Sequence, residues 1–208
     1  MLSEIKSIKE YPNLSWTWNK DIPYVSGIYH FKGENNGIIL KDDFRIKISF
    51  PKDYPCTIPQ VFELDGKIGL NYHHFQSDSS LCLGTEIDLY MIFANNPCID
   101  TFMNDILNPY LYRWLYIQKF GKEPWADRSH GNKGIIESYA ELLNIPTDKE
   151  IVNCFLYLLL ENKTRANSLC PCNSGKKVKC CHKKKLEKLF KKVPQQIFLQ
   201  NLFSLRRK

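Results

Sequence analysis

The chain has 208 residues, enough for one ordinary domain with an appendage or for two small domains. Its composition, 43% hydrophobic and 25% charged, excludes a disordered chain, a collagen and a coiled coil. The longest strongly apolar run, residues 154–160, is far shorter than the about 20 residues that a membrane helix needs, so we expect no membrane partner. The N-terminal residues lack the apolar core of a signal peptide, which predicts a cytoplasmic protein.

The net charge of +7 is unevenly distributed along the chain. Residues 1–162 hold 15 basic and 21 acidic residues, whereas residues 163–208 hold 14 basic residues and the single acid Glu187. We therefore predict two domains with a boundary between residues 162 and 163. The basic segment is either a solvated, solubilising end or a docking element for nucleic acid or an acidic protein surface. Binding of nucleic acid there should be non-specific.

The first third of the chain predicts an antiparallel meander of at least three strands. Residues 24–32 and 44–50 are rich in β-branched and aromatic side chains, and residues 44–50 also alternate apolar with polar. The dipeptide Asn36-Gly37 between them is typical of a type I′ turn, because both central positions of that turn need positive φ. A third strand is expected at residues 60–64, after a segment marked by prolines.

Helices are expected after an irregular polar segment at residues 71–84. Asp100 or Thr101 can cap a helix from Phe102 onward, with Pro109 as a kink or a stop.

Two further helices are expected toward the C-terminus, followed by two apolar and basic stretches. One covers residues 133–143, and a capping box of Thr147 and Glu150 opens another that runs through Leu160. Pro194 then separates two apolar and basic stretches. Strands followed by helices indicate an α+β fold.

Eight cysteines in a chain expected in the cytoplasm are not predicted to form disulfides. Four of them fall within residues 170–181 and indicate a metal site. The other four, Cys56, Cys82, Cys98 and Cys154, are dispersed. Core packing is the default prediction for each, because free cysteine is among the most buried residue types.

The run FRIKISFPKDYPCTIPQVFEL, followed by a long loop into SLCLG, resembles the ubiquitin-conjugating enzyme family. The matches, spread over residues 20–120, are Phe50-Pro51, Tyr54-Pro55, Pro59 and Leu81-Cys82-Leu83. The resemblance implies a meander sheet packed on helices.

The resemblance also implies that Cys82 is a nucleophile, which holds an acyl group as a thioester until a lysine amine attacks it. Small polar residues before Cys82 would leave the sulfur accessible, and Asp78 among them is a candidate substrate-binding residue. The alternative is that Cys82, between two leucines, is simply buried.

One departure from that family concerns the oxyanion. The family's His-Pro-Asn sequence before the cysteine is absent, and this chain has Tyr72-His73-His74-Phe75 instead. The asparagine that would stabilise the oxyanion is therefore missing. His74 stands at its place eight residues before Cys82, and the imidazole of His74 or of His73 can donate a hydrogen bond or can merely brace the loop.

Residues 120–131 (FGKEPWADRSHG) resemble a Pro-Trp…Arg-Ser-His-Gly stretch in bacterial ubiquitin-conjugating-like proteins of cyclic-oligonucleotide-based anti-phage signalling systems (CBASS). That resemblance implies a protein donor with a modifiable C-terminus, of the cGAS-like nucleotidyltransferase kind. Arg128 and His130 are then candidates to line a substrate groove. The alternative is a loop held by packing of Trp125 and a salt bridge of Arg128. Because the sequence has no ATP-binding or adenylating motif, a separate activating partner would be needed.

The segment CPCNSGKKVKCCH, residues 170–182, resembles the SEC-C motif, which ligates zinc through Cys-x-Cys and, eight residues later, Cys-His or Cys-Cys. The resemblance assigns the ligands to Cys170, Cys172, Cys181 and His182 and leaves Cys180 spare. Zinc takes four tetrahedral thiolate or imidazole ligands, and Ser174-Gly175 permits the chain reversal between the pairs. Four protein ligands leave no open position, so a structural zinc is expected. Metal must stabilise a knuckle this small.

Three functions therefore remain open at the level of sequence. The first is a thioester-forming, ubiquitin-conjugating-like transferase with a basic zinc knuckle, acting in anti-phage defence. The second is a non-catalytic ubiquitin-conjugating variant that binds a partner, and the third is a nucleic-acid-binding adaptor led by the basic segment. The altered His-Pro-Asn favours the second, and the retained Leu81-Cys82-Leu83 favours the first.

Overall fold

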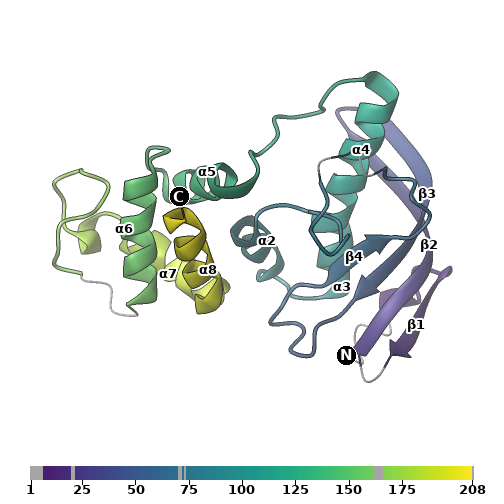
Figure 1. Ribbon diagram of the computed structural model, residues 1–208, viewed down its shortest axis with the longest axis horizontal. Helices are drawn as coiled ribbons and strands as arrows, with labels where there is room; N and C mark the ends of the chain where they lie inside the picture. Colours follow the sequence, from purple (N-terminus) through teal and green to yellow (C-terminus); the bar gives the residue numbers. More distant parts are fainter. Residues whose placement is uncertain (1–6, 20–21, 70–71, 73, 162–165, 208) are drawn as a thin grey trace. The chain divides into compact units, whose positions relative to one another are not determined.

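The computed structural model describes residues 7–19, 22–69, 72, 74–161 and 166–207, and it divides into two compact units (Figure 1). The first unit comprises residues 1–83 and 96–126, and the second comprises residues 84–95 and 127–208. The boundary expected between residues 162 and 163 therefore falls inside the second unit. The chain is of the α+β class, with a four-stranded antiparallel sheet packed against helices.

The sheet of the first unit is a meander in the order β1-β2-β3-β4. Its strands are β1 (Leu14–Asn19), β2 (Ile22–Asn35), β3 (Ile38–Ser49) and β4 (Gln60–Glu63). The predicted turn is confirmed, because Asn36 and Gly37 have φ of 49° and 76° between paired Asn35 and Ile38. Strand β1 is the element of the sheet that the sequence analysis missed.

Alternation along β2 and β3 fixes which face of the sheet is buried. On one face the side chains of Val25, Phe44, Ile46 and Ile48 are fully buried, and their neighbours in sequence point to the other face. Helix α4 (Asn108–Phe120) packs on the buried face (Figure 1). Trp114 of α4 meets Phe44 edge to face with ring centroids 5.7 Å apart.

The helix predicted from Phe102 begins earlier and does not stop at Pro109. Helix α3 (Ile99–Thr101) runs into the π-helical segment η1 (Phe102–Leu107) and then into α4, so neither Asp100 nor Thr101 caps it. Pro109 lies in the first turn of α4. A proline there has no N–H to give to the preceding turn, and the wider π-helical hydrogen bonding just upstream lets the chain pass it without ending the helix.

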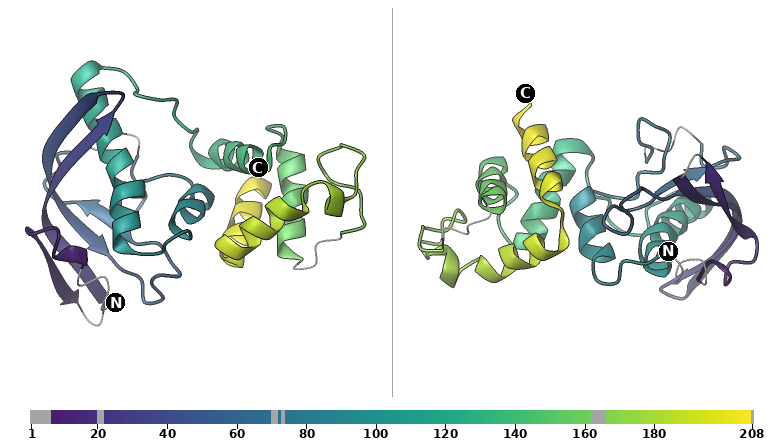
Figure 2. Two further views of the ribbon diagram at one scale, coloured as in Figure 1. Left: turned by 180° about the vertical axis from the view of Figure 1, so that it is seen from behind. Right: turned by 90° about the horizontal axis from the view of Figure 1, so that it is seen from below.

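The second unit is helical. Its helices are α2 (Glu86–Phe93), α5 (Gly131–Leu143), α6 (Lys149–Leu160), α7 (Lys183–Lys192) and α8 (Gln195–Arg206), with a short 3-10 turn, η2 (Val178–Cys180). Helix α6 packs against α8 (Figure 2). The residue that caps α6 is Asp148, not Thr147, because its carboxylate accepts from the N–H groups of Glu150 and Ile151. Pro194 separates α7 from α8 as expected.

Among the described residues, no helix combines the length and the apolar character needed to cross a membrane.

Candidate functional sites

The cysteine and histidine cluster of the second unit lies on a tight loop and the start of α7. The backbone reverses through Asn173 and Gly175, whose φ values are 60° and 71°, a conformation that glycine and asparagine tolerate best. The N–H of Cys170 donates to the carbonyl of Lys176 at 2.8 Å and closes this loop. The reversal brings the Cys170 and Cys172 pair opposite the Cys181 and His182 pair.

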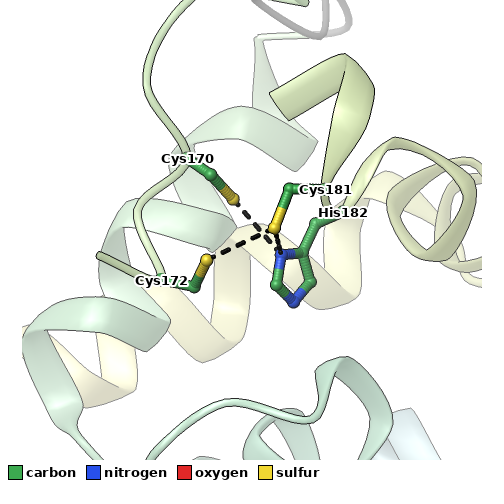
Figure 3. A group of neighbouring side chains, drawn as sticks. All are labelled: Cys170, Cys172, Cys181 and His182. Carbon is green, nitrogen blue, oxygen red and sulfur yellow. Dashed lines mark hydrogen bonds between the residues drawn. The ribbon is translucent and has the colours of Figure 1, made fainter. Parts of the chain in front are cut away.

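The four predicted ligand atoms converge on one point (Figure 3). All lie within 4.8 Å of one another. Nδ1 of His182 is 3.2 Å from the Cys170 sulfur and 3.1 Å from the Cys181 sulfur, and the Cys172 and Cys181 sulfurs are 3.5 Å apart. Tetrahedral zinc with Zn–S bonds of about 2.3 Å would set sulfurs about 3.8 Å apart, so a small expansion admits the ion. The residues therefore fit a metal ion.

Burial and hydrogen bonding act differently on these ligands. Burial raises the pKa of the Cys170 thiol, which is 4% exposed, and lowers the pKa of the His182 imidazole, which stays neutral and able to ligate. Burial also opposes ionisation of Cys172, but hydrogen bonds from Ser174 outweigh it and lower the pKa of that thiol. A bound cation would stabilise all the thiolates together, as three close thiols otherwise cannot ionise at once.

The other side of His182 anchors the cluster to the helices. Its Nε2 lies 3.0 Å from the carbonyl oxygen of Leu143, at the C-terminal end of α5, and its ring lies 5.0 Å from that of Phe155 on α6. Lys185 donates to the same Leu143 oxygen at 2.5 Å. A hydrogen bond from Nε2 directs Nδ1 to the metal, which is the usual arrangement around a ligating histidine. Cys180 is exposed and outside the cluster, as expected.

Cys82 of the first unit ends a short hairpin and is partly exposed. Phe75 pairs with Leu81 across the hairpin, and the N–H of Gln76 donates to the Ser80 carbonyl at 2.8 Å. The N–H of Leu81 donates to Val61 of β4 at 2.8 Å, which fixes the hairpin to the edge of the sheet. Leu81 is buried while the next residue, Cys82, keeps access to solvent.

Asp78 braces this hairpin from within. Its Oδ1 accepts from the Ser80 hydroxyl at 2.6 Å and from the Ser80 N–H at 3.0 Å. Its Oδ2 accepts from the Gln60 amide at 2.9 Å. These hydrogen bonds, from Ser80 above all, lower the pKa of the Asp78 carboxyl. The predicted substrate contact of Asp78 thus stays a prediction, while its contacts within the chain are structural.

His74 meets Cys82 through the backbone. The carbonyl oxygen of His74 accepts from the Cys82 N–H at 2.8 Å and from the Tyr110 hydroxyl at 3.2 Å. The His74 ring lies 4.7 Å from that of Tyr72 and 6.3 Å from that of Tyr110. His73 lies outside the described residues.

Tyr110, on α4, is a residue that the sequence analysis missed. Burial, with Tyr72 and Cys82 nearby, raises the pKa of its phenol, so the hydroxyl remains a donor at neutral pH. Only the fold reveals it, because helical spacing alone assigns Tyr110 to the core.

Arg128 forms ion pairs within the second unit. Its guanidinium lies 2.8 Å from Asp88 of α2 and 2.6 Å from Glu141 of α5. Ser138, fully buried on α5, also donates to Asp88 at 2.7 Å. These are salt bridges of the kind that the alternative interpretation of residues 120–131 describes, and the groove role of Arg128 stays a prediction. His130, the other groove candidate, is exposed at the N-cap of α5, 3.9 Å from Asp127.

The packing roles predicted for the dispersed cysteines are wrong for two of them. Cys56 and Cys154 are exposed, and Cys98 is half-buried at the start of α3. Cys56 lies in the proline-marked segment outside the sheet, and Cys154 faces away from the buried side of α6. The general tendency of free cysteine to be buried is overridden here by the position of each residue on its element.

Comparison of the chain with protein-family models, with curated proteins and with solved structures finds no match. The residues themselves therefore carry the functional argument.

Proposed function

We propose that this chain is a ubiquitin-conjugating-like transferase in which Cys82 carries an acyl group, and that its second unit is held together by a structural zinc ion. The observation that carries the transferase proposal is the presentation of Cys82. Cys82 is partly exposed at the end of a hairpin that backbone hydrogen bonds fix to the edge strand β4. A nucleophile needs both this access and this fixed position.

The chemistry requires an acyl donor that is already activated. The Cys82 thiolate attacks the activated C-terminal carbonyl carbon of a protein partner, a C–S bond forms, and the activating group leaves with its electron pair. An amine then attacks the thioester, the C–S bond breaks, the thiolate is released, and the amine proton passes to solvent. A separate protein supplies the activation, and a cGAS-like nucleotidyltransferase is the donor that the residue 120–131 resemblance favours.

The oxyanion of each step needs a hydrogen-bond donor, and we assign this role to the imidazole of His74 or His73. The contacts of the His74 carbonyl support the assignment for His74, because they hold its backbone next to that of Cys82. Tyr110 has a positioning role in this scheme.

The missing asparagine favours one alternative, a non-catalytic variant that uses the same fold to bind a partner. Phage challenge of cells that carry the full chain with its neighbouring genes separates the two. Cys82→Ala should abolish protection if acyl transfer is required. Cys56→Ser, which removes another exposed thiol, is the matched control and should leave protection unchanged. Full protection by Cys82→Ala would exclude the transferase and favour the binding module.

The zinc proposal depends on the donor set. Three thiolates and one imidazole in a tetrahedral arrangement suit zinc best among common biological metals. Because all four ligands come from the protein, the ion would stabilise the fold of the second unit and would take no part in chemistry.

A further inference from the structure

The lysines of α7 divide into two sets by their contacts. Three of them have polar partners: Lys183 lies 3.7 Å from Glu187, Lys185 donates to Leu143, and Lys192 donates to the Asn95 side chain. The other three, Lys184, Lys188 and Lys191, are exposed and make no ion pair or hydrogen bond with any described residue.

The three unpartnered lysines form one row along the helix. They stand at positions i, i+4 and i+7, which share a face at 3.6 residues per turn. The face lies opposite the buried Leu186 and Leu189, so the packing that holds α7 in the unit turns the row outward. The row extends over about 10 Å, the axial rise of roughly three phosphates of one strand in a duplex.

The knuckle adds further charge close to this row in the sequence. Lys176, Lys177 and Lys179 are exposed on the loop between the two ligand pairs, and no described carboxylate pairs with them. In residues 163–208 the one acid is Glu187, which already faces Lys183. The cationic field of this surface is therefore not neutralised within residues 163–208.

We propose that the row Lys184, Lys188 and Lys191, with the knuckle lysines, binds the phosphodiester backbone of a double-stranded nucleic acid. Lysine ammonium groups pair with phosphates as point charges and specify no base sequence. The row itself contains no aromatic side chain on which unpaired bases could stack, and the exposed Phe190 of α7 stands about 100° around the helix from Lys191, which favours a duplex over a single strand. It also contains no arginine or aromatic anchor of the kind on which protein interfaces depend, which favours a duplex over an acidic protein.

Fluorescence anisotropy with a labelled 20-base-pair DNA duplex tests this proposal on the zinc-loaded full chain. Binding should be insensitive to sequence and should weaken as KCl rises from 50 to 200 mM. Lys184→Gln, Lys188→Gln and Lys191→Gln combined should reduce the slope of log Kobs against log salt by about 2.7, at about 0.9 per phosphate contact. The matched control replaces three exposed lysines of the first unit, Lys32, Lys41 and Lys52, with glutamine and leaves the slope unchanged.

Three outcomes would overturn the proposal. The first is an equal loss of slope in both triple variants, which would mean that binding depends on net charge alone. The second is no duplex binding at 50 mM KCl by a protein of native circular dichroism and full zinc content. The third is tighter binding to polyglutamate or to anionic phospholipid vesicles than to the duplex, with the α7 variant losing that binding, which would assign the surface to an acidic protein or a membrane.

Discussion

The backbone N–H of Cys82 donates a hydrogen bond to the carbonyl oxygen of His74 at 2.8 Å. The same oxygen accepts from the Tyr110 hydroxyl at 3.2 Å, so the helix α4 holds the cysteine hairpin at its base. Two donors on one carbonyl fix the position of residue 74 relative to residue 82. This arrangement explains why a loop of small polar residues can still present Cys82 in a defined position.

Tyr110→Phe should loosen this hairpin. It removes one hydroxyl, at a cost of about 1 kcal/mol, and we expect Cys82 to be alkylated several-fold faster by iodoacetamide. Peptide mass spectrometry measures the rate at each cysteine. Tyr112→Phe is the control, because the Tyr112 hydroxyl also donates to a backbone carbonyl, that of Ile38, at 3.1 Å. The same change in Cys82 alkylation in both variants would show that Tyr110 has no specific effect on the hairpin.

Asp78 should make the stability of the first unit depend on pH. Hydrogen bonds from Ser80, and then from Gln60, lower its pKa below the ordinary 3.8. A carboxyl whose pKa is lower in the folded state stabilises the fold above its unfolded pKa, and this contribution disappears as pH falls through the folded value. Asp78→Asn should therefore be less stable than the wild type at pH 6, and the gap should narrow toward pH 3. Thermal unfolding of both proteins between pH 6 and pH 3 measures this difference in stability. A difference that grows toward acid would contradict a lowered pKa for Asp78.

Metal content tests the ligand set directly. Purified protein should contain about one zinc per chain, and Cys172→Ser should release it because three ligands then remain of the four. Cys180→Ser is a matched control, since Cys180 stands beside Cys181 but outside the cluster. Plasma emission spectrometry gives the stoichiometry. Zinc loss from Cys180→Ser with retention in Cys172→Ser would refute the ligand assignment.

Removal of the metal should also destabilise the C-terminal end of α5. His182 donates through Nε2 to Leu143, and the neighbouring N–H of Ile145 donates to Ala140 at 3.0 Å to close the helix end. We expect the amides of residues 144 and 145 to exchange faster with deuterium in Cys172→Ser than in Cys180→Ser. Exchange that accelerates only within residues 170–182 would show instead that the knuckle is independent of the helices.

The sequence predicts best those features that depend on residues close together in the chain. The Asn36-Gly37 turn needs only two residues with positive φ, and the cysteine and histidine cluster needs only a short spacing and a glycine. Both appear in the structure with the residues expected. Strands β2 and β3 were predictable for the same reason, since alternation of side chains depends on a repeat of two residues.

The remainder depends on contacts between distant residues. The partnership of Arg128 with Asp88 joins positions 40 residues apart, and Tyr110 reaches a carbonyl 36 residues away. Neither contact produces a motif or a regular spacing that could be recognised in the sequence. No motif predicts the hydrogen bond between His182 and Leu143, which crosses the boundary that the sequence predicts between residues 162 and 163.

The proposed acyl transfer rests on Cys82, and the most direct test is covalent capture at that position. Intact-mass analysis of full-length Cys82→Ser, purified from its native host in dithiothreitol, should reveal an adduct that persists in thiol and is cleaved by hydroxylamine, because an alkoxide is a poorer leaving group than a thiolate. The wild-type adduct should be lost in dithiothreitol, and Cys56→Ser, Cys98→Ser and Cys154→Ser should behave as the wild type does. The account would be contradicted by two results obtained together. Cys82→Ser would carry no thiol-resistant adduct, and the wild type prepared in parallel would carry a thiol-labile adduct on another cysteine.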